Sequence, residues 1–466
     1  MDNMEKNQTE NLHVSRHADR SLYSTLAKIA LPLALQNLIS YGVGLADNFM
    51  VGSLGDAALS GVLISNQVQW LLYMLCAGLS AAMVILAAQY IGKGNIDKAK
   101  IVVTITIKIA LGIAVLMTLV VSLFPASILT LFSEDAEVIA QGMRYLPIVC
   151  VTYVFFCSNS MLLASMRCVN NTRIGFLSSL TGFFVNVFLN WVLIFGNLGF
   201  PALGVFGAAV ATLAARIVEF IVTSVYVFFV DKVLCFRLKD LMLWDRLLLL
   251  DFFKYGSPVI LGDILWGIGG AAQIAILGRL GAEVLAANTI AANLHQLLSV
   301  MVYAIAGASG VIIGRAVGSG DVEKVKAYSR KLQKVFLLFG VITGLTIFML
   351  KDVILAIGFR AISAEAYSYA IQFLTVFSIT IVGTSYQMSV LTGIVRAGGA
   401  TSFVLLNDLF WVWIVVIPSA LLSAFVFNFP PVVVFACLKC DQVLKCSVAV
   451  IKLHRWNWMK KLTREN

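Results

Sequence analysis

The sequence has 466 residues, of which 60% are hydrophobic and only 12% are charged, and its mean hydropathy is +0.92. Soluble domains carry about twice that charged fraction, so this composition excludes a soluble globular protein and predicts one that lives in lipid. The net charge of +10 could suggest nucleic-acid binding, but the positions of the basic residues argue for contact with anionic lipid headgroups instead.

Hydropathy predicts an all-α integral membrane protein, because a spanning helix needs about 20 mostly apolar residues. About twelve such segments follow one another, near 24–51, 59–88, 101–123, 138–164, 174–197, 205–230, 250–278, 285–314, 334–357, 366–394, 402–426 and 430–451. The alternating polarity of a membrane barrel is absent, which leaves helices. The last segment is the weakest, because Lys439, Asp441 and Lys445 lie within it.

The connecting segments predict the domain organisation. We expect a cytoplasmic tail at 1–23, a six-helix bundle at 24–230, a cytoplasmic linker with an interfacial amphipathic segment at 231–249, a second bundle at 250–451 and a basic cytoplasmic tail at 452–466. Residues 1–22 are polar throughout and do not resemble a signal peptide, so the first span is expected to act as its own insertion signal.

Lysine and arginine collect in segments that stay inside the cell. If the N-terminus is cytoplasmic, the outer segments hold only Arg144, Arg279, Lys351 and Arg360, and nearly all other basic residues fall on the inner side. Both termini are therefore predicted to be cytoplasmic, in a plasma membrane.

Motifs for enzymatic or ATP-driven chemistry are missing from the sequence. No GxxxxGK[ST] loop occurs, and the 4 histidines suggest neither a catalytic triad nor a metal site. Cys437 and Cys440 form a CxxC within an apolar helix without a second pair, so the 8 cysteines are interpreted as small buried hydrophobic residues. We expect no enzyme activity and no cofactor.

The two halves of the chain resemble each other. Shifted by 226 residues, Pro32 meets Pro258, the run 52–55 meets 278–281, and 92–95 meets 318–321; shifted by 229, residues 167–172 meet 396–401 and Arg216 meets Lys445. Six spans per copy is an even number, so the copies have the same orientation and form parallel repeats. Two such halves can rock around a central cavity, which favours transport over a receptor or scaffold.

The same segments resemble the multidrug and toxic compound extrusion (MATE) family over nearly the whole chain. The resemblance is carried by Pro32, the run 47–55, the run 167–172, Asn186, Asn190, the run 204–212, the run 396–401, Asp408, Trp413 and Pro418. It implies two six-helix bundles that form a V-shaped cleft, and export of diverse, often cationic compounds in exchange for Na⁺ or H⁺.

Asp47 is the main candidate for cation coupling, because an ionised carboxylate in hydrocarbon is costly and usually functional. Gln36, Ser40, Gly44 and Asp47 share one helix face, and the family counterpart of Asp47 is the coupling carboxylate. Burial favours the neutral form of a carboxyl, so Asp47 could bind a proton near neutral pH or hold Na⁺ among neutral oxygens. The alternative is a structural, hydrogen-bonded aspartate.

Asn186 and Asn190 lie one turn apart in the fifth span and can face the same interior. The family commonly has a carboxylate at the position of Asn190, and the amide found here cannot titrate. We therefore expect Asp47 to have neutral partners, with helix packing through buried amides as the alternative role of the two asparagines.

The second half offers weaker candidates. Asp263, which matches Asn37 in the first repeat, is interpreted either as a cation or substrate contact or as a buried hydrogen-bond acceptor. The Na⁺-coupled branch of the family carries an acid in the tenth span, where this chain has none. His295 could relay protons but is more simply a hydrogen-bonded core residue. Gln69, Tyr386 and Gln387 could line the cleft or pack between helices.

Two pairs of opposite charge are expected to neutralise each other within a helix. Arg216 and Glu219 are three residues apart, and Asp441 and Lys445 are four apart. Because Arg216 and Lys445 are repeat mates, both pairs are interpreted as structural.

These observations predict a secondary multidrug exporter with alternating access, driven by H⁺ or Na⁺, without nucleic acid or an obligate protein partner, monomeric and bacterial. No metal is expected beyond Na⁺ at Asp47. The alternatives are a related flippase for lipid-linked sugars or polysaccharide, which would have more spans and a cationic cavity, and a membrane receptor or scaffold that transports nothing.

Overall fold

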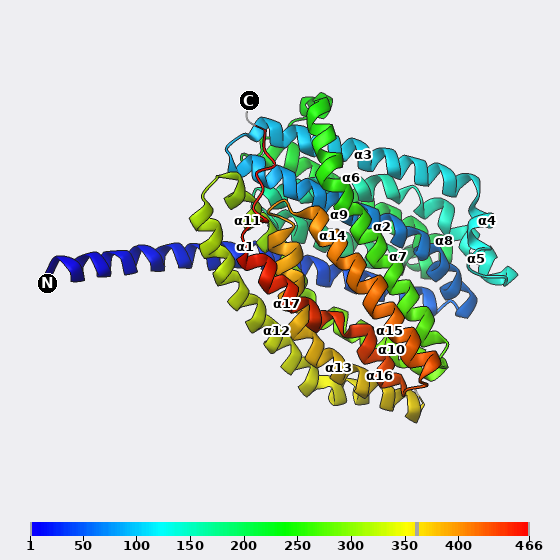
Figure 1. The fold of residues 1–466 in the computed structure, drawn as a ribbon. Helices are drawn as coiled ribbons and strands as arrows, with labels where there is room; N and C mark the ends of the chain where they lie inside the picture. Colours follow the sequence, from blue (N-terminus) through cyan, green and yellow to red (C-terminus); the bar gives the residue numbers. More distant parts are fainter. Residues whose placement is uncertain (1, 359–362, 465–466) are drawn as a thin grey trace.

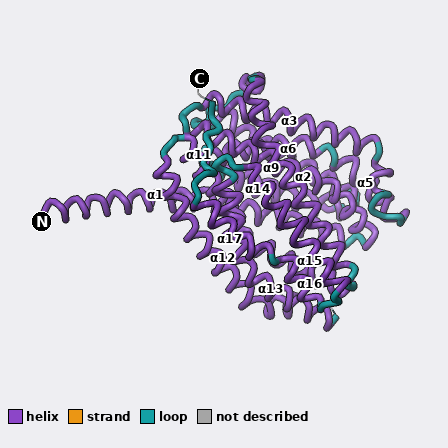
Figure 2. The backbone as a smooth tube through the Cα atoms, in the orientation of Figure 1, coloured by secondary structure: helices purple, strands orange, loops and turns teal. Residues whose placement is uncertain are grey.

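A computed structural model describes residues 2–358 and 363–464. Residues 1, 359–362 and 465–466 lie outside the description, and with them Arg360, one of the basic residues predicted on the outer side. The described chain consists of helices and loops without a strand (Figure 2). The all-α prediction is confirmed.

The first half contains eight α-helices and two short helical turns. They are α1 (Asp2–Gly52), α2 (Asp56–Gly92), α3 (Ile96–Leu123), α4 (Pro125–Leu129), α5 (Ala136–Val149), α6 (Thr152–Cys168), α7 (Arg173–Phe195), η1 (Asn197–Gly199), α8 (Val205–Val225) and η2 (Tyr226–Val230). Helix α1 begins well before its predicted span, so the residues predicted as an N-terminal tail continue the first helix outward (Figure 1).

The second half repeats this series after a linker. The linker contains the short turn η3 (Leu238–Met242). The second half contains α9 (Arg246–Gly278), α10 (Ala282–Leu298), α11 (Val300–Gly318), α12 (Val322–Gly358), α13 (Ala364–Met388), η4 (Ser389–Val395), α14 (Thr401–Leu409), η5 (Phe410–Val416), α15 (Ile417–Leu421), η6 (Leu422–Val426), α16 (Pro431–Lys439) and α17 (Asp441–His454).

The predicted spans agree with these helices in place, and up to eleven of the twelve also qualify by length and apolarity. In the described ranges, 10 helices are long and apolar enough to cross a membrane, and α5 with α6, bent by 49°, would make 11. Pro147 lies inside α5 and removes a backbone donor just before that bend. The predicted twelfth span corresponds to α16 and α17, which do not meet the same apolar standard, in keeping with the charges at 439, 441 and 445.

The helices form two groups that follow the sequence repeat. In Figure 1 the first half and the second half meet near the end of the molecule where both termini lie, and diverge toward the opposite end. Helix α1 packs on α11 of the other half, and its repeat mate α9 packs on α2. This reciprocal packing is what a two-fold relation between parallel repeats requires.

Two glycines mark the tightest contact between the halves, where α2 and α11 cross. A Cβ atom on Gly92 would lie 2.0 Å from the carbonyl oxygen of Arg315, and one on Gly318 would lie 2.0 Å from that of Gln89. Gly92 and Gly318 are repeat mates, and so are Gln89 and Arg315. Only glycine at both positions allows backbones to approach so closely, so the sequence repeat and the contact between halves have the same symmetry.

The segment between the halves packs beneath α3 and is shorter than predicted. Phe236 is buried, Asp240 forms an ion pair of 3.4 Å with Lys100, and its carbonyl accepts a hydrogen bond from Thr104. Helix α9 begins at Arg246 instead of near 250, because the Asp245 side chain caps its first turn. A position along the membrane surface stays a prediction for this linker.

Candidate functional site

A cavity of about 300 Å³ lies within the first half and is lined by α1, α2, α5, α7 and α8. Its lining consists of Ser40, Val43, Gly44, Asp47, Asn66, Gln69, Trp70, Tyr73, Tyr145, Gly182, Asn186, Thr212, Ala215, Arg216 and Glu219. The predicted polar face of the first span, from Ser40 to Asp47, thus forms one wall.

The Asp47 carboxylate is held by an amide. The Nδ2 group of Asn190 donates to Asp47 Oδ1 over 2.6 Å and is also 3.2 Å from Asn186 Oδ1. Both asparagines are buried on α7, one turn apart, as their spacing predicts. Asp47 therefore has the neutral partners that the sequence predicts.

An unsatisfied acceptor lies beside this carboxylate. Asn190 Oδ1 is buried and has no hydrogen-bond partner among the residues that the structure describes. Buried polar atoms in proteins are nearly always paired, so this oxygen is available to a bound cation or donor. One carboxylate with amide oxygens around it has the hard oxygen chemistry that suits a proton or Na⁺. The described residues contain no group of three or more His, Cys, Asp or Glu that could hold a metal ion.

The predicted Arg216–Glu219 ion pair is formed, with 2.8 Å between Nη1 and Oε2, and it lies in the cavity wall. The guanidinium acts on Asp47 electrostatically, but its direct partner is Glu219. A Cβ atom on Gly182 would lie 2.3 Å from Glu219 Oε1, so this glycine makes room for the pair. With Asp47 ionised, these three groups give the cavity one net negative charge.

Aromatic rings form another part of the wall. Trp70 and Tyr73 are stacked with 5.6 Å between centroids and 11° between planes, and Tyr73 stacks on Phe156 at 5.9 Å. The predicted cleft residue Gln69 lines the same cavity. A flat ring surface near a net negative charge offers stacking and electrostatic attraction to an aromatic cation.

Two predicted residues of α1 lie outside this lining. Gln36 packs on α7, where a Cβ on Gly175 would lie 2.5 Å from Gln36 Oε1. Asn37 is half-buried and is not part of the cavity wall. The polar face of α1 therefore serves helix packing at one end and the cavity at the other.

Asp263 in α9 is bound to a fixed cation. Its Oδ1 and Oδ2 accept from Nη1 and Nη2 of Arg396 over 3.1 and 3.2 Å. A bidentate carboxylate–guanidinium pair of this kind is already satisfied. The geometry favours the second of the two predicted roles, a hydrogen-bond acceptor within the protein.

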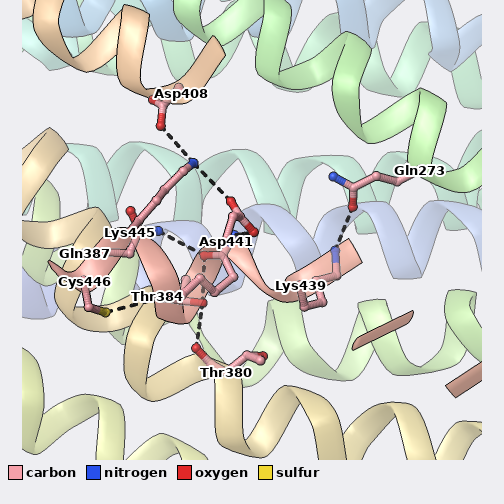
Figure 3. Close-up of polar contacts among 10 residues, drawn as sticks. Gln273, Thr380, Thr384, Gln387, Asp408, Lys439, Asp441, Lys445 and Cys446 are labelled. Atoms are coloured by element: carbon pink, nitrogen blue, oxygen red, sulfur yellow. Dashed lines mark hydrogen bonds and ion pairs between the residues drawn. The ribbon is translucent and has the colours of Figure 1, made fainter. Parts of the chain in front are cut away.

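Figure 3 shows the other charged cluster of the second half, in which Lys445 lies between two aspartates. Its ammonium is 3.0 Å from Asp441 Oδ2, as the helical spacing predicts, and also 3.0 Å from Asp408 Oδ1. The Asp408 contact joins α17 to α14 and could not be predicted from spacing. Nearby, Lys439 donates to Gln273 over 3.0 Å.

The remaining candidates of the second half contact protein groups away from the described cavity. Gln387 donates to Gln442 over 3.0 Å, and Tyr386 donates to Gln333 over 2.7 Å. His295 stacks on Phe377 with 4.2 Å between ring centroids. These contacts agree with the packing alternatives, and a role of these residues in a cleft between the halves stays a prediction.

Sequence reasoning did not single out several of the lining residues, among them Asn66, Tyr73, Tyr145 and Thr212. Asn66 is a polar residue within the apolar second span, which is the same signal that singled out Gln69. Thr212 ends the 204–212 run that carries the family resemblance. Tyr145 gave no signal, because its position depends on how α5 packs against α2 and α8.

The family model described as MatE matches residues 32–192 and 258–432, one segment in each half. Among curated proteins, the chain is 28% identical to the multidrug resistance protein NorM of Aliivibrio fischeri, covering 84% of this chain and 85% of that one. It is 27% identical to the probable multidrug resistance protein NorM of Thermotoga maritima, covering 71% of each.

Solved structures share the fold. A mutant of the Vibrio cholerae MATE transporter VcmN superposes with a TM-score of 0.86 at 18% identity and covers 96% of this chain and 99% of its own. A transporter of the MOP superfamily from Pyrococcus furiosus superposes with a TM-score of 0.83 at 19% identity, covering 92% and 95%. The architecture of two helical bundles is therefore that of these transporters.

Proposed function

The chain belongs to the multidrug and toxic compound extrusion family, whose MatE model it matches in both halves, and we propose that it exports small organic, often cationic compounds in exchange for H⁺ or Na⁺. Relatives at 27–28% identity carry the name multidrug resistance protein. A multi-pass transporter without enzymatic activity is what this membership implies. The proposed location is a bacterial plasma membrane with both termini inside.

The observation that carries the proposal is the state of Asp47. A half-buried carboxylate held by a neutral amide, next to an amide oxygen that no described residue bonds, is open to a cation. A proton or Na⁺ entering from outside would neutralise the carboxylate and supply Asn190 Oδ1 with a donor or a cation. A fixed ion pair at the same place would leave a mobile cation nothing to neutralise.

The cargo would occupy the same cavity. Trp70 and Tyr73 offer their ring faces, and the net negative charge attracts a cation. A cavity of about 300 Å³ is at the small end for a ligand site, so cargo and coupling ion would compete. Cation binding at Asp47 would then lower the affinity for the drug in the outward-facing state, as exchange requires.

The alternatives from the sequence gain no support from this site. A flippase for phosphate-linked sugars would need a cationic cavity, whereas the described one carries a net negative charge. A scaffold without transport would have no use for the symmetric contact between α2 and α11.

The test is gradient-driven efflux of ethidium from inside-loaded vesicles, measured under an imposed pH or Na⁺ gradient. We expect Asp47→Asn to lower the gradient-driven rate by about tenfold or more, since coupling free energies of this kind are on the order of 1–3 kcal/mol. The control is Asp56→Asn, which changes an exposed aspartate in the first turn of α2 and should not change the rate. Unaltered gradient-driven efflux in Asp47→Asn would remove this residue from the mechanism.

A further inference from the structure

The segment after the last helix crosses from one half of the protein to the other. Helix α17 ends at His454, and residues 455–464 continue without regular helix. The first part is fixed to the second half: Trp458 is fully buried, its indole nitrogen donates to Leu453 over 3.0 Å, and Lys460 donates its backbone N–H to the Gly398 carbonyl over 2.8 Å.

The last part of the segment is fixed to α2 of the first half. The backbone N–H of Leu462 donates to Gln89 Oε1 over 2.9 Å, and that of Arg464 donates to the Tyr90 hydroxyl over 3.3 Å. Lys93 donates to the Arg464 carbonyl over 2.9 Å. Three polar side chains at the end of α2 and its C-cap thus hold a segment of chain that comes from the other half.

Gln89 is the centre of this contact. Its side chain is fully buried, and besides accepting from Leu462 it donates to the carbonyls of Ala397 at 3.2 Å and Lys460 at 3.4 Å. The backbone oxygen of the same residue faces Gly318 across the α2–α11 crossing. One buried amide therefore joins α2, the loop before α14 and the tail at the point where the halves are closest.

An ion pair joins the last described residue of the tail to α9. The Arg464 guanidinium makes two hydrogen bonds to the Asp251 carboxylate at the start of α9, 2.6 and 2.9 Å long. Arg464 is 41% exposed and Asp251 is 11% exposed. Water and salt weaken so exposed a pair, so the buried Gln89 contacts dominate.

We propose that residues 455–464 are a latch that keeps the inner end of the contact between the halves closed and must release α2 before the inner side can open. The inference rests on the proposed alternating access. Separating α2 from α11 moves Gln89 away from Ala397. The tail is bonded to both halves, so it can stay with only one of them when they separate. Since Trp458 is buried in the second half, the tail stays there, and the bonds from Gln89, Tyr90 and Lys93 are the ones that break.

Opening can be followed without transport through Cys168. This cysteine is fully buried at the last residue of α6, a helix that contacts α11 of the other half, so it reports on the contact between the halves. In a variant in which all other cysteines are replaced, the rate of reaction with a membrane-impermeant maleimide from the cytoplasmic side measures how often the inner side opens.

Gln89→Leu keeps the side-chain volume and removes the three hydrogen bonds. The backbone groups that bonded Gln89 are then buried without a partner in the closed state, which costs free energy and favours the open state. We expect Cys168 to react about tenfold faster. Gln372→Leu, which removes only a contact to Ser368 within α13, is the matched control and should leave the rate unchanged. An equal rise in Gln372→Leu would indicate general loosening and overturn the proposal.

Three further variants keep the test decisive if Gln89→Leu folds poorly. A chain that ends after Met459 retains Trp458 but lacks every bond from the tail to α2, and should also label faster. Arg464→Glu should raise the rate about twofold, and adding Asp251→Lys should restore it. If labelling in the truncated chain equals that of the full chain, the latch is refuted. Because labelling needs no gradient and no drug, failure of Asp47 coupling would leave this result untouched.

Discussion

The two halves of the protein descend from one pattern, yet the acids in their first helices, Asp47 and Asp263, have different partners. In the first half Asp47 faces a cavity and is held by the Asn190 amide. In the second half Asp263 is bound to Arg396, and Lys445 is shared by Asp408 and Asp441. The duplication preserved the helices and the crossing glycines but not the chemistry. Asp47 thus has an amide as its partner, whereas these three acids of the second half have cationic ones.

The largest effect on stability should come from removing the cation that Asp408 and Asp441 share, Lys445. Lys445→Met leaves the buried carboxylate of Asp441 and the partly exposed one of Asp408 without their cation. We expect a loss of about 3–5 kcal/mol of stability, because removing one partner of a buried pair leaves uncompensated charge. Thermal unfolding in detergent would measure it. Lys439→Met is the matched control: that ammonium contacts an amide and two rings, so its removal should cost far less. Equal losses in both variants would refute the contrast.

The second prediction concerns the space around the Arg216–Glu219 ion pair in the cavity wall. Gly182→Ala places a methyl group against Glu219 and forces the Arg216–Glu219 pair to shift, and we expect a loss of about 1–3 kcal/mol, as for other overpacked sites. Gly112→Ala in α3 points into open space and should be neutral or slightly stabilising, since alanine is the better helix former. Thermal unfolding of both variants measures these changes in stability. If Gly182→Ala is as stable as the parent protein, the Arg216–Glu219 pair has room to move and the prediction is wrong.

Hydropathy predicted the fold well, because lipid permits little besides helices of fixed length. The spans, the weakness of the twelfth and the repeat all follow from local composition and spacing. The start of α9 was placed four residues late, since the Asp245 cap, a local signal, was overlooked.

The candidate site was predictable only where polarity interrupts an apolar helix. Asp47, Asn186, Asn190 and Gln69 stand out in this way. The Lys445–Asp408 contact does not, because it joins helices distant in the sequence. The tail contacts to Gln89 were equally invisible: a basic segment at the end of a chain looks the same whether it is free in water or held against another helix.

The smallest expected effect is on cargo binding, and it tests which of the two halves binds the cargo. Trp70→Ala removes the ring that stacks on Tyr73 in the cavity, and we expect the KM for an aromatic cation such as ethidium to rise about fivefold, the magnitude of one partly exposed cation–π contact. The maximal rate should change little, because Asp47 and its amide partner remain. Trp266→Ala, an exposed tryptophan of α9 in the half whose acids are paired, should leave KM unchanged. If instead Trp266→Ala raises KM and Trp70→Ala does not, the cargo binds in the second half, and the net negative cavity beside Asp47 serves the coupling ion only.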